Sequence, residues 1–369
     1  MRVFIPIGPH PQYREIVDYP PKGVEYEVYG KSDPKAYYSK SNLTKRKAAR
    51  LVTRVLAIPR IFYYKTDADL IFSTRGITPL NRKPWVTEFE HPYAFVGMDY
   101  NNWGWRQRRF VKFLISSKNC KRLMPNSYAA MMALKNSFDA SRIDSKLEVV
   151  KLAVHYKKIK RIKHDKVTLL TIGNDDVYGR GFNIIKDAFP ELKRKYDIEW
   201  TIKTNQQFHP KDNAFIERYG VKVVRGILSD KEMDELFGRS DIYVFQSPGE
   251  TNSIAMYEAM RAGLPVVSTD AFAFPEKVIP GYNGFMVHTP HVFWRKDFLR
   301  DSKHDIDYSR YHNRKLSDEL YGYVEYLVKH RKERLKMGKN AELTIKNGPL
   351  SVQVRNEKLR EIFESAIKR

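Results

Sequence analysis

The chain has 369 residues, of which 42% are hydrophobic and 30% are charged, a balance that fits a folded globular protein and excludes wholesale disorder. The 66 Lys and Arg residues outnumber the 43 Asp and Glu residues, and the net charge of +23 favours polyanionic or phosphorylated partners. Cys120 is the single cysteine, which excludes an intrachain disulfide framework and a cysteine-rich zinc site and fits a reducing, cytoplasmic location.

In the first half of the chain, short apolar segments alternate with longer segments of helical pattern. The sequence predicts strands at 3–7, 69–73, 84–89 and 121–127. Helices are predicted at 44–58, where Leu51, Val55 and Ile58 share one face, and at 103–117. No hydrophobic run in the sequence is long enough to span a bilayer.

The second half repeats the same alternation. Strands are predicted at 167–173, 198–204, 221–226, 241–247 and 264–269, with helices such as 181–196 and 230–240 between them. Strands that are apolar throughout and alternate with helices are typical of parallel sheets covered on both faces. We therefore expect an α/β protein with two Rossmann-like domains facing across a cleft.

Composition suggests how the chain divides. We predict an N-terminal domain at 1–155, a basic linker at 156–165, a second domain at 166–345 and a final segment at 346–369. Residues 1–150 carry a net charge of +13 and residues 151–165 add +5, whereas residues 166–345 add only +2. We therefore expect the positively charged surface that attracts anions to lie on the first domain and the linker.

The segment 245–270 holds the most informative pattern. A strand ends at Gln246, and a turn with proline and glycine follows it. A helix is expected to open near Asn252 or Ser253, both good N-cap residues, and to stop at Gly263. The free N–H groups at the start of such a helix form a ready site for an anion.

Two glutamates bracket the start of this helix. Glu250 and Glu258 are eight residues apart, a span of about 12 Å at 1.5 Å per residue, which is the order of a sugar–diphosphate–ribose length. One carboxylate could accept hydrogen bonds from sugar hydroxyls and the other from a ribose. The alternative is a pair of unrelated surface glutamates on an amphipathic helix.

The residues around this pair resemble the signature of the retaining glycosyltransferases of family 4, which have the GT-B fold. The match runs from Ser-Pro and then Glu250 through seven residues to Glu-Ala-Met and then Ala-Gly-Leu-Pro-Val-Val. The resemblance extends over 166–290 and is thinner over 1–155. It implies transfer of a sugar from a UDP- or GDP-linked donor with retention of configuration and without a metal or other cofactor. It also implies that the last helix, 352–369, crosses back onto the first domain.

The resemblance implies roles for residues around the first glutamate. Glu250 would contact the hydroxyls of the donor sugar, and Glu258 would contact the ribose. The backbone amides that would line the sugar–phosphate pocket are those of Thr251, Asn252, Ser253 and Ile254. The family has a glycine-rich turn where this chain has Thr251-Asn252-Ser253, so the identity of the sugar is left open.

The resemblance also points to two basic ligands of the diphosphate in the loop 171–183. Arg180 matches the second of them, because a cation before a glycine can neutralise the charge on a leaving group. The first is replaced by Asn174, which cannot supply a charge. Lys203, at the end of the next predicted strand, either compensates for this loss or is an ordinary surface lysine.

Three positions in the first domain resemble family positions, and two glutamates flank one of them. His91 matches the active-site histidine at a strand end, with Glu88 and Glu90 nearby, and it would orient the sugar or the acceptor. Gly8 follows the first strand, where a glycine would let the backbone approach the donor. Ser127 matches a serine at a helix entry and could be only an N-cap.

Basic and aromatic residues are interleaved in two segments of the first domain. They are Lys45, Arg46, Lys47, Arg50 and Arg54 in one segment, and Trp103, Trp105, Arg106, Arg108 and Arg109 in the other. Such segments can lie at an anionic membrane surface or stack on single-stranded nucleic acid, or they can be helices whose aromatic residues pack inward.

The leading function is therefore transfer of a sugar to a lipid-linked or glycan acceptor at a membrane surface, by a cytoplasmic and peripheral enzyme. A DNA-modifying glycosyltransferase and a non-catalytic nucleic-acid-binding protein are the alternatives. The sequence does not indicate the oligomeric state.

The sequence predicts no metal site. Asp67 and Asp69 form a D-x-D pattern, but this pattern leads into a predicted strand instead of following one. His288 and His291 have no evident third ligand nearby in the sequence.

Overall fold

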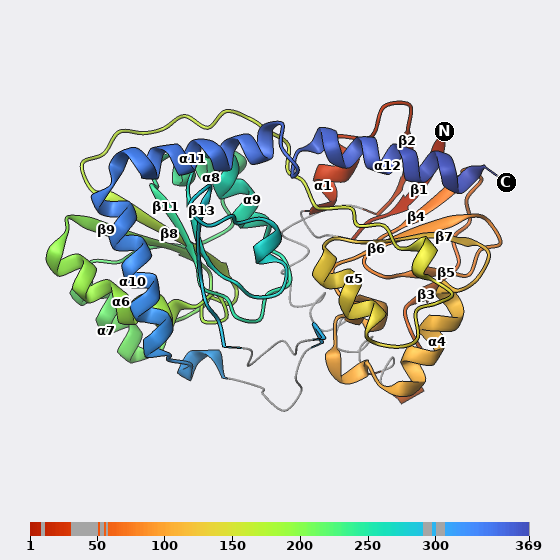
Figure 1. The fold of residues 1–369 in the computed structure, drawn as a ribbon, viewed down its shortest axis with the longest axis horizontal. Coiled ribbons are helices and arrows are strands. Elements are labelled where there is room, and N and C mark those ends of the chain that lie inside the picture. Colours follow the sequence, from red (N-terminus) through yellow and green to blue (C-terminus); the bar gives the residue numbers. More distant parts are fainter. Residues whose placement is uncertain are drawn as a thin grey trace. The chain divides into compact units, whose positions relative to one another are not determined.

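The computed structural model describes residues 1–8, 12–30, 51, 55–56, 58–290, 297–299 and 307–368. The chain divides into two compact units (Figure 1). Unit 1 consists of residues 1–155 and 352–368 with residues 297–299, and unit 2 holds the remaining described residues. Lys45, Arg46, Lys47, Arg50 and Arg54 of the predicted helix 44–58 lie outside the described residues.

Unit 1 is built on a five-stranded parallel sheet. Its strands, in spatial order, are β2 (Glu25–Tyr29), β1 (Arg2–Pro6), β4 (Leu70–Ser73), β6 (Trp85–Phe89) and β7 (Cys120–Pro125). A separate pair joins β3 (Ile61–Phe62) to β5 (Thr78–Pro79). The structure confirms the four strands predicted in this half and adds β3, β5 and β2, in which two glutamates alternate with tyrosine and valine.

The helices described for unit 1 are short except for the last one, which has 16 residues and comes from the end of the chain. They are α1 (Gln12–Val17), η1 (Pro92–Val96), η2 (Tyr100–Asn102), α4 (Trp105–Ile115), α5 (Tyr128–Lys135), η3 (Asp144–Lys146) and α12 (Val352–Ile367). Helix α12 packs on β4, β6 and β7, and Phe363 meets Phe72 with ring centroids 5.4 Å apart. The core of unit 1 thus includes residues from both ends of the chain.

Unit 2 is built on a six-stranded parallel sheet. The order is β10 (Lys222–Val224), β9 (Ile198–Thr204), β8 (Val167–Asn174), β11 (Ile242–Phe245), β12 (Val266–Thr269) and β13 (Gly284–Val287). The first five of these in chain order confirm the predicted strands. Strand β13, at one edge, was not predicted.

Helices cover both faces of the unit 2 sheet (Figure 1). They are α6 (Phe182–Lys195), α7 (Pro210–Tyr219), α8 (Asp230–Gly238), α9 (Ile254–Arg261), η4 (Phe274–Glu276), η5 (Tyr308–Arg310), α10 (Arg314–Lys329) and α11 (Arg331–Lys346). Helix α10 packs on α6, and α11 packs on α9. The contact between α11 and α9 is close: a Cβ added at Gly338 would lie 2.2 Å from the carbonyl oxygen of Gly263.

In each sheet, the chain first adds strands on one side of the first strand and then adds the remaining strands on its other side. In unit 1 the reversal point between these two directions lies between β1 and β4, and in unit 2 it lies between β8 and β11. In open parallel sheets, ligands bind in the crevice at the carboxyl ends of the two strands that flank such a point. The fold of unit 2 therefore directs attention to the loops that follow β8 and β11.

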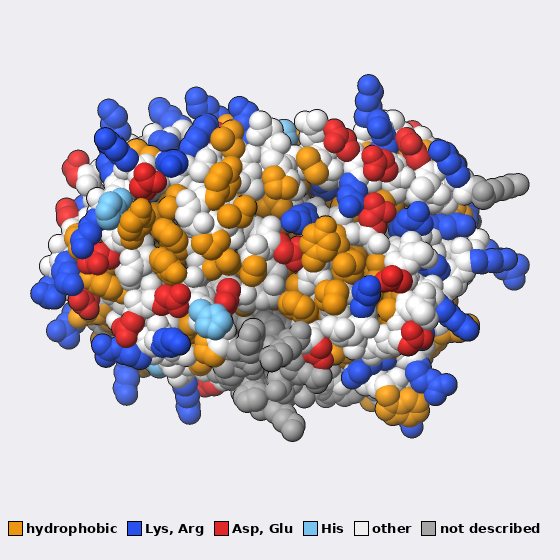
Figure 2. Space-filling model, in the orientation of Figure 1, with side chains coloured by type: hydrophobic (Ala, Val, Ile, Leu, Met, Phe, Trp, Pro, Cys, Tyr) orange, Lys and Arg blue, Asp and Glu red, His pale blue; other side chains and the backbone are white. Residues whose placement is uncertain are grey.

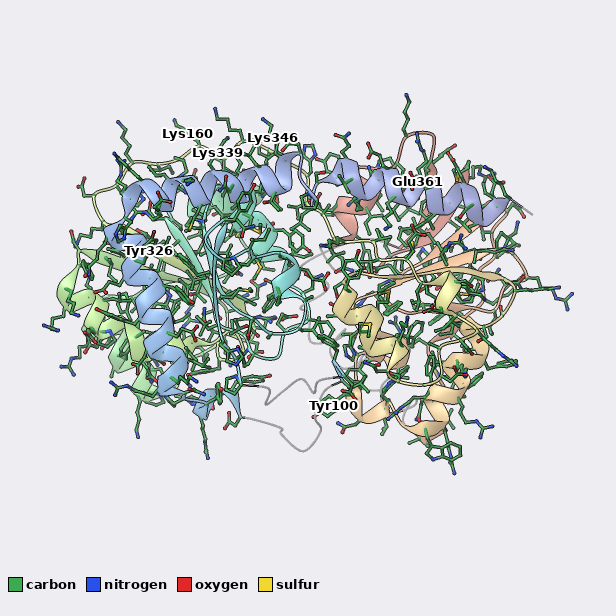
Figure 3. All side chains as sticks on the ribbon, in the orientation of Figure 1. Tyr100, Lys160, Tyr326, Lys339, Lys346 and Glu361 are labelled. Carbon is green, nitrogen blue, oxygen red and sulfur yellow. The ribbon has the colours of Figure 1, made fainter. Side chains whose placement is uncertain are left out.

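The predicted linker has no helix or strand between residues 151 and 164. It is nevertheless fixed to unit 2 by ion pairs of Lys157 with Asp234 (2.7 Å) and of Arg161 with Asp241 (3.2 Å). Lys160 carries an exposed side chain on this segment (Figure 3). Among the described residues, no helix is both long enough and apolar enough to cross a membrane.

Unit 1 buries one carboxyl group at the end of β6. Glu88 accepts a hydrogen bond from the backbone N–H of Arg75 (3.1 Å). Burial raises the pKa of Glu88 above its ordinary value of 4.5, and this effect outweighs the hydrogen bond, which lowers it. The folded protein therefore holds this proton over a range of pH in which the unfolded chain has lost it.

Replacing Phe363 with alanine should destabilise unit 1, because the ring is fully buried between α12 and the sheet. We expect a loss of about 3–5 kcal/mol in the free energy of unfolding, measured by urea denaturation. Val354→Ala, at an exposed position of the same helix, is the control and should change little. A loss of under about 1 kcal/mol for Phe363→Ala would contradict the docking of α12.

Replacing Glu88 with glutamine should change how stability depends on pH. Because the pKa of Glu88 is raised in the folded state, the wild type loses stability as pH rises above about 4.5, by at most about 1.4 kcal/mol per pH unit. Glu88→Gln lacks this titration. Its free energy of unfolding, measured by urea denaturation, should therefore rise relative to that of the wild type as the pH increases. Glu25→Gln, at an exposed position, should show no such trend; parallel curves for Glu88→Gln and wild type would refute the raised pKa.

Candidate functional site

The two loops at the reversal point of unit 2 touch each other. The backbone N–H of Gln246, after β11, donates to the carbonyl oxygen of Arg180, in the loop that precedes α6 (3.1 Å). Gly181 makes this approach possible: its φ is +84°, and a Cβ there would lie 2.2 Å from the carbonyl oxygen of Gln246. Only glycine fits at the junction, so the position of Arg180 is fixed by the backbone.

The two loops bring together the charged residues predicted from the sequence. Arg180 and Glu250 form an ion pair, and both side chains are largely buried. The guanidinium group of Arg180 also lies 5.6 Å from the ring centroid of Phe245. Because the two charges face each other in a partly desolvated place, removing either one leaves the other without its partner.

Two helices start beside this ion pair. Helix α9 begins at Ile254, directly after the N-cap Ser253, and helix α6 begins at Phe182, directly after Gly181. Neither N-cap residue offers a side-chain hydrogen bond to its helix. The backbone N–H of Phe182 donates to the carbonyl oxygen of Val177 (3.3 Å), whereas the later N–H groups of the first turn of α6, the first turn of α9 and the positive ends of both helix dipoles can meet an anion at this crevice.

Glu258, the second glutamate of the pair, lies on α9. Its carboxylate and the guanidinium of Arg180 both act on the phenol of Tyr243, on β11, which places the three groups in one neighbourhood. Burial is the main cause that raises the pKa of Tyr243. The structure therefore gathers Arg180, Glu250 and Glu258 around the start of α9.

Asn174 and Lys203 are hydrogen-bonded to each other. The ammonium group of Lys203 donates to Oδ1 of Asn174 (2.8 Å) at the carboxyl ends of β8 and β9. Burial lowers the pKa of Lys203, while Asp175 raises it. The side chain of Lys203 is buried and so is not that of an ordinary surface lysine, and it brings a positive charge to the place where Asn174 has none.

Lys277 was not identified from the sequence, although it lies within the site. Its side chain is 3% exposed, and its ammonium group donates to Oδ1 of Asn252 (2.5 Å). It also lies 5.5 Å from the ring centroid of Tyr257 and 5.1 Å from that of Phe274. A buried cation next to Asn252 adds positive charge to the end of α9 that is already positive. The only signal in the sequence was a lysine placed among apolar residues after η4.

His91 is buried, and both of its ring nitrogens are engaged. Nδ1 accepts a hydrogen bond from the backbone N–H of Tyr93 (3.3 Å), and Nε2 is 3.1 Å from the carbonyl oxygen of Phe298. This pattern assigns the neutral tautomer with its proton on Nε2. A ligand that contacts Nε2 would have to take the place of the Phe298 carbonyl.

The structure also shows the surroundings of Gly8 and Ser127, two further positions of unit 1. A Cβ at Gly8 would meet nothing within 4 Å, so packing does not require a glycine there. The side chain of Ser127 accepts a hydrogen bond from the backbone N–H of Ala130 (3.0 Å) and is the N-cap of α5. Neither observation assigns a ligand to these residues.

The basic and aromatic segment at 103–113 is only partly a surface. Trp103 is buried, and its indole N–H donates to Oγ of Ser137 (3.0 Å), so the expectation of a surface role is wrong for this residue. Its neighbour Trp105 is 64% exposed at the start of α4. Arg108 is held by the Trp103 carbonyl oxygen (3.0 Å), whereas Arg106 and Arg109 are exposed.

Residues of the two metal-like patterns have partners within the protein. One carboxylate oxygen of Asp69 accepts a hydrogen bond from the backbone N–H of Arg2 (2.8 Å), and His288 is paired with Asp270 (2.7 Å). In the part of the chain that the structure describes, no group of three or more His, Cys, Asp or Glu side chains is arranged to hold a metal ion.

Comparison with known proteins adds a family pattern to this geometry. Residues 166–295 match the family model described as Glycosyl transferases group 1. The chain is 26% identical over 209 residues to the MMP alpha-(1->4)-mannosyltransferase of Mycolicibacterium hassiacum, covering 53% of this chain and 51% of that protein. It is 31% identical over 129 residues to the phosphatidyl-myo-inositol mannosyltransferase of Propionibacterium freudenreichii subsp. shermanii, covering 34% of this chain and 31% of that protein. The matched part thus spans about half of the first relative and a third of the second.

Solved structures resemble the whole chain. HepE (Alr3699) of Anabaena, in complex with UDP and glucose, has a TM-score of 0.63 at 14% identity, covering 99% of this chain and 100% of its own. The sucrose-phosphate synthase of Thermosynechococcus elongatus has a TM-score of 0.63 at 10% identity, covering 99% and 98%. These likenesses confirm the predicted fold class, and the chain has the GT-B fold, with the sequence pattern of group 1 glycosyl transferases on the segment that holds the site.

Proposed function

We propose that this protein is a retaining glycosyltransferase of family 4 that takes a sugar from a nucleotide diphosphate sugar. The observation that carries the proposal is the Arg180–Glu250 ion pair between two helix N-termini at the reversal point of unit 2. A group that is anionic on one side and rich in hydroxyls on the other fits this arrangement. The match of residues 166–295 to group 1 glycosyl transferases supports the same reading.

In the proposed complex with the donor, contacts between protein side chains are replaced by contacts with the donor. The diphosphate would take the N–H groups at the starts of α6 and α9 together with the guanidinium of Arg180. Glu250, released from Arg180, would accept hydrogen bonds from the sugar, and Glu258 would accept them from the ribose. Lys203 and Lys277 would add positive charge on either side of the diphosphate.

The proposed reaction replaces one bond at the anomeric carbon. The bond from this carbon to the phosphate oxygen breaks, a bond to the acceptor oxygen forms on the same face, and the acceptor proton passes to the departing phosphate. Arg180 and the helix N-termini would stabilise the negative charge that grows on the nucleotide. We propose that this stabilisation needs no bound metal or other cofactor.

The relatives suggest the classes of donor and acceptor. HepE was solved with UDP and glucose, and two relatives are named as mannosyltransferases, which supports a UDP- or GDP-linked donor. One of the two is named for phosphatidyl-myo-inositol. We propose a lipid-linked or glycan acceptor for this chain, reached at the cytoplasmic face of an anionic membrane.

The exposed side of α4 supports a membrane surface. Trp105 and Phe113 are 64% and 74% exposed, and Arg106 and Arg109 are exposed beside them. Figure 2 shows a hydrophobic side chain among Lys and Arg at this end of unit 1. Apolar side chains can enter the lipid interface while the cations meet lipid phosphates.

Glu250→Gln and Arg180→Ala should each reduce sugar transfer by about 100-fold or more, because each removes a group aimed at the charge or hydroxyls of the donor. The donor is first chosen by thermal shift with a panel of UDP- and GDP-sugars, and turnover is then measured with that donor. Glu217→Gln and Arg239→Ala, which change charge elsewhere in unit 2, are the matched controls. Near-normal turnover by Glu250→Gln or Arg180→Ala in folded protein would refute the assignment.

Trp105→Ser combined with Phe113→Ser should weaken binding to vesicles that contain phosphatidylglycerol, because it removes both inserted side chains of α4. We expect a decrease of about tenfold or more in cosedimentation affinity at low salt. Leu335→Ser, at an exposed apolar position of unit 2, is the control. Unchanged sedimentation of the double variant would show that α4 does not meet the membrane.

A further inference from the structure

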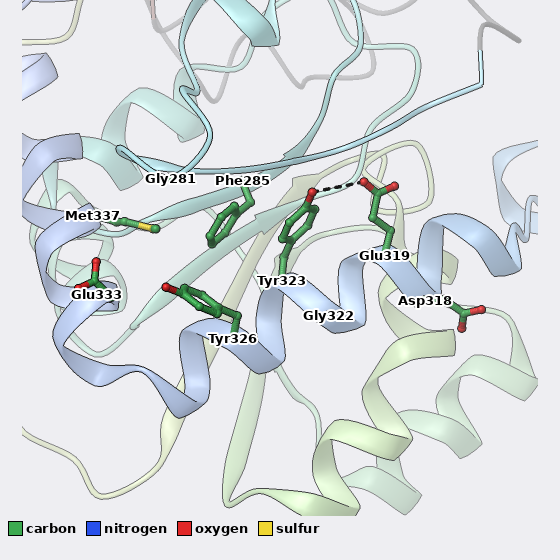
Figure 4. Close-up of a pocket in the computed structure, with 9 residues that line it drawn as sticks. All are labelled: Gly281, Phe285, Asp318, Glu319, Gly322, Tyr323, Tyr326, Glu333 and Met337. Carbon is green, nitrogen blue, oxygen red and sulfur yellow. Dashed lines mark hydrogen bonds between the residues drawn. The ribbon is translucent and has the colours of Figure 1, made fainter.

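A second pocket lies in unit 2, among residues that the proposed sugar transfer does not use (Figure 4). Its volume is about 570 Å³, within the range of small-molecule sites. It is lined by strand β13, the loop before it, and helices α10 and α11. The lining residues are Gly281, Phe285, Asp318, Glu319, Gly322, Tyr323, Tyr326, Glu333 and Met337.

Three aromatic rings form the middle of this pocket. Phe285 and Tyr323 are stacked, with centroids 4.7 Å apart and planes inclined by 7°. Tyr326 stands perpendicular to Phe285 at 5.6 Å and is 37% exposed. The three rings form a corner of apolar surface, and Tyr326 is also stacked on His330, with ring centroids 4.3 Å apart.

Carboxylates lie beyond the rings in both directions (Figure 4). Glu333 lies on the side of Met337, and Glu319 lies on the side of Tyr323, whose hydroxyl is 3.5 Å from it. Along α10 alone, Glu319 and Tyr326 are about 10 Å apart at 1.5 Å per residue. The pocket is therefore apolar in its middle and acidic at its two ends.

Gly322 leaves space in this pocket, although a glycine destabilises the helix that carries it. A glycine inside a helix is less favourable than alanine by about 1 kcal/mol. A Cβ at Gly322 would meet nothing within 4 Å, so close packing does not explain the glycine. It lies on α10 between the acidic end and the rings, where a side chain would narrow the pocket.

The charge of the pocket is opposite to that of the chain. The described residues that line it include three acids and no Lys, Arg or His, in a protein with a net charge of +23. Figure 2 shows hydrophobic side chains gathered over α10 with carboxylates around them, on a unit otherwise edged by Lys and Arg. The ion pairs of Asp318 with Arg314 and of Glu333 with Lys336 are exposed, so they are weak and can be exchanged.

We propose that this pocket binds a linear aliphatic oligoamine. Its terminal ammonium groups pair with the carboxylates at the two ends, and its methylene chain lies on the rings of Phe285 and Tyr326, where cation–π attraction adds to apolar contact. A neutral sugar has no positive charge that could replace Arg314 and Lys336 as partners of the acidic ends. The proposal does not depend on sugar transfer.

The test uses spermidine as the probe and the full chain in isothermal titration calorimetry at low salt. We expect saturable 1:1 binding that weakens as salt is added, because part of the attraction is electrostatic. Glu333→Gln and Tyr326→Ala should each weaken binding about fivefold, the equivalent of about 1 kcal/mol. Gly322→Leu should weaken it at least as much, because it fills the pocket, and a thermal melt shows whether the helix is kept.

Two controls make the result decisive. Glu217→Gln removes the same charge from an exposed position of α7 and should leave spermidine binding unchanged. Maltotriose, a neutral sugar of similar length, should not bind. Absence of spermidine binding, binding that all pocket variants leave unchanged, or binding of maltotriose in place of spermidine would each overturn the proposal.

Discussion

The ion pair between Arg180 and Glu250 is the interaction on which the site depends. It joins two loops that are far apart in the sequence. These loops follow β8 and β11, the two neighbouring strands of unit 2 from which the chain continues toward opposite edges of the sheet. Gly181 permits the approach because any side chain there would strike the carbonyl of Gln246. Backbone geometry therefore fixes where the charges lie before a ligand arrives, and this is the preorganisation that charge stabilisation requires.

Much of the fold could be predicted because its strands are apolar throughout and bounded by turns. The strands that were missed lie at sheet edges, where the signal is weak: β2 alternates glutamates with tyrosine and valine, β13 begins with a glycine, and β3 and β5 are two residues long. For the site, the spacing of Glu250 and Glu258 suggested a pair, and the resemblance of the flanking residues to a known family gave both glutamates and Arg180 their expected roles. Lys277 could not be found in that way, because its importance comes from burial beside Asn252, which only the packing of η4 against α9 creates.

The two tryptophans of one short segment show the same limit on a smaller scale. Trp103 and Trp105 are two residues apart and read alike in the sequence, yet one is hydrogen-bonded to Ser137 in the core and the other is exposed. Helix α4 begins at Trp105, so the helical periodicity that would separate the two does not extend back to Trp103. The pattern of aromatic and basic residues suggested an exposed surface, and the position at which α4 begins determines which of these residues are exposed.

The contact of Gly338 with Gly263 extends the reach of the site into α11. Helix α9 ends where its backbone meets that of α11, with no room for even a methyl group between them. Any larger residue at position 338 must displace the helix whose other end holds Ser253 and the free N–H groups. A survey of tolerated substitutions would thus count Gly338 among the functional positions, although it takes no part in the chemistry.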